Sequence, residues 1–280
     1  MNNMTDLNRK QNSKAAASER ALKSTRIYNW VNLIAYVAMV TVNILANALP
    51  LGGNTSGQVS DRYPSLFTPA GITFSIWGVI YALLGIVMVR QLISKREGNA
   101  AMTQNIGILF TVSCVLNIGW IFSWHFGMIT GSTLLILALL ITLILINVLV
   151  REDMLMKITF GIYFAWIMVA SVASIFVNAS ALGADLINRT GEVLAAIAVI
   201  FSGGVLLTLT MLGNNWEMAL VGIWAYIGII VRQSSLYSGH YALVIGSAIT
   251  MLIVLTAGIG YSLLRKKEIT FGQSPSGVPD

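Results

Sequence analysis

Charged side chains are scarce in this sequence. Only 10% of its 280 residues are Asp, Glu, Lys or Arg, whereas 56% are hydrophobic and the mean hydropathy is +0.77. So few charges cannot cover the surface of a water-soluble protein of this size. The composition therefore excludes a soluble globular fold and predicts an integral membrane protein.

Groups that form disulfides or bind metals are scarce as well. The single cysteine, Cys114, excludes an intramolecular disulfide, and two histidines without clustered carboxylates predict no metal site. A glycine-rich phosphate loop is missing, which excludes ATP hydrolysis at such a loop. The middle of every long apolar stretch also lacks Asp, Glu, Lys and Arg. Ion-coupled transporters usually keep an ionisable group at membrane depth, so this absence argues against an ion-driven transporter.

The sequence instead has eight long apolar stretches. They cover Trp30–Leu49, Ile72–Ile93, Ile106–Phe126, Leu134–Val150, Ile158–Ala181, Val193–Leu212, Trp216–Val231 and Tyr241–Leu264. Most are long enough to cross a hydrocarbon layer of ~30 Å at ~1.5 Å per residue. Each should be a helix, because lipid offers no partners to backbone polar groups. The sequence thus predicts an all-α, polytopic membrane bundle of about eight transmembrane helices, with a short seventh helix.

Positive charge is sorted to alternate gaps between these stretches. Of the 17 Lys and Arg residues, thirteen lie in the terminal segments and the gaps after the second and fourth stretches, and Arg90 lies at the end of the second stretch on the same side. The other gaps hold only Arg62, Arg189 and Arg232. By the positive-inside rule, both termini are cytoplasmic, and we expect a bacterial plasma membrane protein. The net charge of +6 then reflects topology and contact with anionic membrane lipids rather than nucleic-acid binding.

The chain divides into four segments by composition. Residues 1–26 form a basic cytoplasmic segment, 27–181 a five-helix membrane core, 182–264 an additional three-helix region, and 265–280 a flexible cytoplasmic tail. No internal repeat relates the additional region to the core, so an inverted-repeat transporter is not supported. Glycines in the additional helices suit close packing on the core or a homodimer.

Aromatic and neutral polar side chains gather on single faces of four predicted helices. These faces carry Asn32, Tyr36, Asn43 and Asn47; Phe74, Trp77, Tyr81, Gly85 and Met88; Ser113, Asn117, Trp120 and Trp124; and Tyr163, Trp166, Ala170, Ser174 and Asn178. An amide that faces lipid costs free energy, so these faces should point inward. Two interpretations stay open: the amides join helices and the aromatics fill volume, or the faces line a cavity for a flat, largely apolar ligand. Trp30, Trp124 and Trp216 lie at span ends, where we expect interface anchors.

The first outer loop, Leu49–Gly71, is rich in turn formers and prolines. Asp61 and Arg62 are its adjacent charges, placed to pair with each other or to hold another loop. The segment suits a lid over a cavity and an ordered connector equally well.

Three segments together resemble the tryptophan-rich sensory protein family, also called translocator protein or TspO/MBR. They are YPSLFTPAGITFSIWGVIY (63–81), LNIGWIFSWHF (116–126) and IYFAWIMVASVASIFVN (162–178). The first keeps the family's Trp-x-x-x-Tyr spacing, the second its Asn-x-x-Trp, and the third its Tyr and Trp of the fifth helix. The resemblance covers about residues 27–180. The chain departs from the family pattern at Thr68, Ile162 and Ser174, where the family commonly has Pro, Pro and Asn.

The resemblance implies that porphyrins, sterols or similar flat molecules bind among five helices under the first long loop. By position, it implies the ligand-binding residues Phe74, Trp77, Tyr81, Asn117, Trp120, Tyr163 and Trp166. The leading hypothesis is therefore a non-enzymatic receptor, sensor or carrier whose partners are membrane lipids and a small hydrophobic ligand, with porphyrin, heme or a lipid as the candidate ligand. A permease or export component for a small solute is the alternative, and a tetrapyrrole-modifying enzyme is the third.

Overall fold

The computed structural model describes residues 27–49, 51–93, 100–150, 153–213 and 215–272, and the regular structure in these ranges is helical. Within these described ranges eight helices are long and apolar enough to cross a membrane, which confirms the predicted all-α class and the predicted number of spans. The first helix covers Ile27–Ala48. The other elements are η1 (Leu51–Gly53), α2 (Ser56–Asp61), η2 (Gly71–Ser75), α3 (Ile76–Ile93), α4 (Ala100–His125), α5 (Ile129–Leu149), α6 (Met154–Ala181), α7 (Arg189–Gly213), α8 (Trp216–Tyr237) and α9 (Ala242–Gly272).

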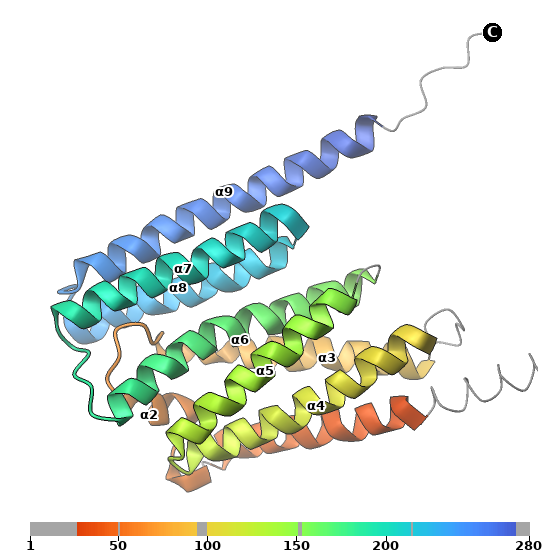
Figure 1. Ribbon diagram of the computed structural model, residues 1–280, viewed down its shortest axis with the longest axis horizontal. Helices are drawn as coiled ribbons and strands as arrows, with labels where there is room; N and C mark the ends of the chain where they lie inside the picture. The colour runs from red at the N-terminus through yellow and green to blue at the C-terminus, as the bar shows by residue number, and fades with distance from the viewer. Residues whose placement is uncertain (1–26, 50, 94–99, 151–152, 214, 273–280) are drawn as a thin grey trace, which may run out of the picture.

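The long helices form two groups that meet along α6 and α8. The first helix and α3–α6 make one group, and α7, α8 and α9 make the other, as Figure 1 shows. The α6 helix lies at the centre of the bundle. In its apolar 18-residue stretch 67% is buried, whereas only 22% is buried in the corresponding stretch of the first helix. The inward face predicted for the first helix is confirmed at Asn32 and Asn43, which are both buried. Thr111 Oγ1 donates to Asn32 Oδ1 at 2.8 Å, and this bond joins the first helix to α4.

The sequence predicts a short seventh span, and this prediction is wrong. The helix continues past Val231 to Tyr237. Its last turns carry Arg232 and Gln233, which are buried. Arg232 Nη1 donates to Asp61 Oδ1 at 2.6 Å, and Gln233 Nε2 donates to the Leu66 carbonyl at 2.7 Å. Because these side chains have partners in the loop before α3, the helix extends past the end of its apolar stretch.

Close glycine contacts hold α7, α8 and α9 together. A Cβ at Gly203 would lie 2.5 Å from Met251 Sδ, and one at Gly222 would lie 2.6 Å from Leu206 Cδ1. A Cβ at Gly258 would likewise lie 2.6 Å from Leu207 Cδ1. A larger residue at any of these positions would have to displace the facing Met or Leu side chain.

Asp153 fixes the start of α6. Its Oδ1 accepts from the Met156 N–H at 3.0 Å, and its Oδ2 pairs with Arg90 at the end of α3. Burial raises the pKa of this carboxyl, but the Met156 N–H and the Arg90 guanidinium together outweigh burial, so the pKa lies below its ordinary value. The charged form therefore stabilises the α3–α6 contact.

Candidate functional site

The predicted ligand-binding residues lie together between α3, α4 and α6. Trp77 is the hub of the aromatic ones. Its ring centroid is 5.4 Å from that of Tyr81, 5.5 Å from Trp120, 6.0 Å from Tyr163 and 6.4 Å from Trp166. Phe74 joins the cluster edge-on to Trp166, with ring centroids 6.0 Å apart. The stripes on three helices thus form one aromatic cluster.

Asn117 connects this cluster to the first helix. The Asn43 amide donates to Asn117 Oδ1 at 2.7 Å, and the Asn117 amide donates to the Tyr163 hydroxyl at 3.2 Å. On the same side of the bundle, the Tyr36 hydroxyl donates to the Tyr81 carbonyl at 2.8 Å. These bonds join the first helix, α3, α4 and α6 without a ligand, so Asn117 and Tyr163 already have a packing role.

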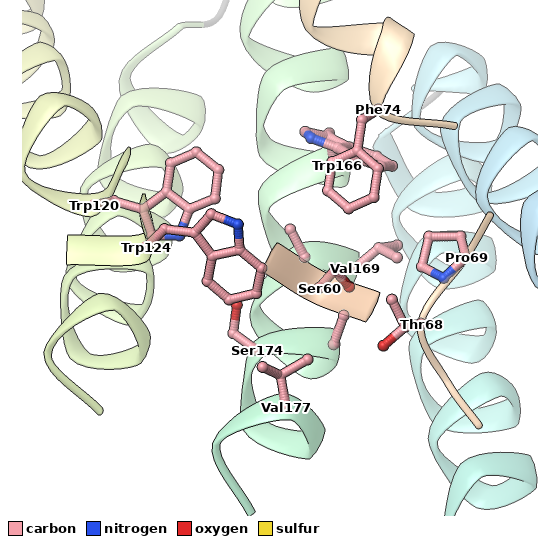
Figure 2. Close-up of a pocket in the computed structure, with 12 residues that line it drawn as sticks. Ser60, Thr68, Pro69, Phe74, Trp120, Trp124, Trp166, Val169, Ser174 and Val177 are labelled. Atoms are coloured by element: carbon pink, nitrogen blue, oxygen red, sulfur yellow. The ribbon is translucent and has the colours of Figure 1, made fainter. Parts of the chain in front are cut away.

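A small cavity lies beside the cluster, toward the end of the bundle that carries α2. Its volume is about 30 Å³, little more than the space for one or two waters. Figure 2 shows Trp120 and Trp124 on one side of this cavity and Thr68 and Pro69 on the other. Its lining residues are Ser60, Thr68, Pro69, Phe74, Trp120, Trp124, Trp166, Val169, Ala170, Ala173, Ser174 and Val177. Of the predicted site residues, Phe74, Trp120 and Trp166 line the cavity, whereas Trp77, Tyr81, Asn117 and Tyr163 do not.

Several donors around the cavity have no partner. Trp120 Nε1, Trp166 Nε1 and Thr68 Oγ1 are buried and make no hydrogen bond within the part of the chain that the structure describes. Most buried polar groups in proteins are paired. An indole N–H can only donate, so a partner for either tryptophan would have to be an acceptor from outside these residues, such as a water or a ligand.

The position of Trp124 near a span end predicts an interface anchor, but the structure places this residue elsewhere. Only 4% of the residue is exposed, and its Nε1 donates to the Ser56 carbonyl in α2 at 3.1 Å. The sequence did not show that the loop before α3 folds back over the end of α4. The prediction is therefore corrected: Trp124 is a wall of the cavity.

The loop over the cavity is ordered. Thr55 and Gln58 form a capping box, in which the Thr55 N–H donates to Gln58 Oε1 at 2.8 Å and the Gln58 N–H donates to Thr55 Oγ1 at 3.4 Å. Further along, Phe67 is fully buried and stacks on Phe176 of α6, with ring centroids 5.6 Å apart. The capping box fixes the start of α2, and the Phe67 stack holds the later part of the loop against α6.

The α8 helix holds the same loop from the other side. Asp61 pairs with Arg232 across 171 residues of sequence rather than with its neighbour Arg62. The Ala70 N–H donates to the Gly228 carbonyl at 3.0 Å, and Trp224 Nε1 donates to the Thr73 carbonyl at 2.9 Å. Together with the bond from Gln233 to Leu66, these contacts attach residues 61–73 to α8, and we call them the α8 clamp.

Sequence reasoning missed the α8 clamp. Part of the signal was present: Arg232 and Gln233 directly follow an apolar stretch and need partners, and Asp61 is a charge in the first outer loop that could hold another segment. Nothing in the sequence indicated which of them meet. Gly228 is also explained only by the structure, because a Cβ there would lie 2.1 Å from Thr73 Oγ1 and 3.0 Å from Pro69 Cβ.

The chain matches the model of a protein family. The model of a family described as TSPO-like protein matches residues 29–261. The match begins in the first helix and ends in α9, so it includes α7 and α8, which lie outside the segment that carries the three sequence motifs. No curated protein and no solved structure matches the chain.

Proposed function

The chain belongs to the TSPO-like protein family, and on this premise we propose that it binds a flat hydrophobic ligand of the porphyrin or sterol type in the aromatic cavity. In this proposal the protein is a membrane receptor, sensor or carrier. Trp120 and Trp166 contact the ligand directly. Trp77 and Tyr163 hold these two rings from behind.

The unpaired indole N–H groups of Trp120 and Trp166 are the observation that carries the proposal. An unpaired buried donor costs about 1–3 kcal/mol, and a ligand that offers an acceptor removes this cost. Porphyrin carboxylates and a sterol hydroxyl are such acceptors, and the aromatic rings suit their flat apolar bodies.

The cavity must enlarge to admit such a ligand. A space of about 30 Å³ cannot hold a porphyrin or a sterol, whose sites usually measure about 300–1,000 Å³. The loop of residues 49–71 is the movable wall in this proposal, because Ser60, Thr68 and Pro69 line the cavity from it. The structure then corresponds to a closed conformation, and opening requires that the α8 clamp loosen.

A tryptophan-fluorescence titration of the purified protein tests this function. Protoporphyrin IX, heme and a sterol are the ligands, and pyrene serves as a flat probe without a hydrogen-bond acceptor. Trp166→Phe keeps an aromatic ring but removes the N–H, so porphyrin affinity should fall about 5- to 30-fold, equivalent to about 1–2 kcal/mol. Affinity for pyrene should change much less.

Trp30→Phe is the matched control, because Trp30 lies on the outer surface of the first helix with 58% exposed. Its porphyrin affinity should equal that of the wild type. If Trp166→Phe and Trp30→Phe bind porphyrin equally well, the aromatic cavity is not the binding site.

The same material separates the two other functions. An enzyme acting on tetrapyrroles would change the absorption spectrum of bound porphyrin over time, whereas a receptor or carrier leaves it unchanged. A permease would release a trapped solute from vesicles that contain the protein, and the rate would not depend on Trp166.

A further inference from the structure

A second opening lies on the side of the bundle, between α3, α6 and α8. This lateral groove has a volume of about 420 Å³, against about 30 Å³ for the aromatic cavity. Val79 of α3 and Leu220 and Trp224 of α8 line it and are 52%, 47% and 37% exposed. Among the described residues, none lines both the groove and the aromatic cavity. The groove is therefore a separate space, and in a membrane it opens toward lipid.

Glu217 places a carboxylate in the wall of this groove. It lies in the first turn of α8 and is only 2% exposed. Its Oε1 makes no hydrogen bond to any residue in the described ranges, and the ion pairs found there do not include it. Lys157 carries the neighbouring positive charge, but its Nζ donates to the Gly213 carbonyl at 2.7 Å.

The fold makes specific room for this carboxylate. A Cβ at Gly161 of α6 would lie 2.7 Å from Glu217 Oε1 and 3.2 Å from its Cγ, so glycine at this position leaves room for the Glu217 side chain in its present rotamer. The other buried carboxylate, Glu192, differs, because it pairs with Arg189 at 2.7 Å and accepts from the Leu243 N–H at 2.9 Å. Glu217 has its own backbone N–H as a hydrogen-bond partner, but its Oε1 stays unpaired. A buried carboxylate oxygen without a partner is costly, and a cation from outside the chain removes that cost.

We propose that the lateral groove binds a membrane amphiphile whose head group is a protonated amine. The ammonium pairs with Glu217, and the apolar chain runs along Val79, Ile162 and Trp224. From Glu217 to Trp224 the groove follows α8 for seven residues, or ~10 Å at ~1.5 Å per residue. It therefore holds the head group and the first part of a chain, and the rest of the chain extends into lipid.

Native mass spectrometry of the purified full-length protein, titrated with dodecylamine and with dodecanol, tests the proposal. The two probes have the same chain and differ in charge. Dodecylamine should occupy one saturable site at least tenfold more tightly than dodecanol, since only the amine forms the ion pair. Glu217→Gln should reduce dodecylamine affinity at least tenfold and leave dodecanol affinity unchanged.

Two further variants complete the test. Glu192→Gln removes the other buried carboxylate and should leave the affinity for dodecylamine unchanged. Val79→Trp fills the groove at a half-exposed position while Glu217 stays intact, and it should reduce affinity for both probes at least tenfold. Equal binding of amine and alcohol by the wild type would overturn the proposal. Full amine affinity in Glu217→Gln or in Val79→Trp would overturn the proposal as well. If Glu217→Gln does not fold, Val79→Trp still tests the proposal.

Discussion

Breaking the ion pair between Asp61 and Arg232 should speed ligand release. Arg232 is buried with 6% of its side chain exposed, whereas 56% of the Asp61 side chain is exposed. Removing one partner of a fully buried pair costs about 3–5 kcal/mol, and an exposed pair contributes about 0–1 kcal/mol. For this half-exposed pair we expect that Asp61→Asn weakens the closed loop by about 1–2 kcal/mol. If opening of the loop limits release, the off-rate of a porphyrin rises about 5- to 30-fold, with little change in the on-rate.

Stopped-flow fluorescence of porphyrin release measures this effect directly. Arg62→Gln is the control, because it removes the neighbouring charge that does not pair with Asp61, and its off-rate should match the wild type. In a double-mutant cycle, Asp61→Asn combined with Arg232→Gln should be no faster than Asp61→Asn alone. An unchanged off-rate in Asp61→Asn, or additive effects in the cycle, would show that the α8 clamp does not control release.

Further substitutions and reporters test other parts of the structure. Gly228→Ala places a Cβ 2.1 Å from Thr73 Oγ1, so it should lower the free energy of unfolding by about 1–3 kcal/mol. It should also speed cleavage at a protease site inserted at 54–58. Bound porphyrin should protect that site from cleavage. Asp153→Ala removes the N-cap of α6 and should lower the free energy of unfolding at neutral pH by about 0.5–2 kcal/mol. The pKa of Asp153 in the folded protein lies below its ordinary value of 3.8. The stability difference between wild type and Asp153→Ala is therefore complete above pH 3.8 and shrinks as the pH falls through the folded pKa. Denaturation in detergent at a series of pH values measures this difference. Topology reporters at positions 10 and 275 should both be cytoplasmic and one in the 52–60 loop external, and an external reporter at 275 would mean that a span is miscounted.

The sequence was sufficient for the parts of the fold that depend on periodicity. Trp77 and Tyr81 on one helix, Trp120 on a second and Tyr163 and Trp166 on a third are spaced to share a face within each helix. Polar atoms and bulky rings on a helix in lipid are best placed toward other helices, so their meeting in one cluster could be anticipated. The seven predicted residues accordingly lie together, although only three of them line the cavity.

Contacts between distant segments could not be predicted in the same way. Arg232 ends an apolar stretch, and sequence alone suggests that the helix ends there, because a charge in lipid is costly. The helix continues because Asp61 supplies the counter-charge from a loop 171 residues earlier. Trp124 shows the same limit. Its position near a span end is visible in the sequence and predicts an interface anchor, but the Ser56 carbonyl that accepts its N–H cannot be identified from the sequence.

The α8 helix connects the two proposed sites through a single side chain. Trp224 lines the lateral groove, and its N–H also donates to the Thr73 carbonyl, where the loop over the aromatic cavity leads into α3. A ligand in the groove that moves this indole therefore changes a contact that holds the loop. Such a coupling is reciprocal, so a ligand that opens the loop must change the affinity of the groove by the same factor. The α8 helix would then take part in both of the proposed binding sites.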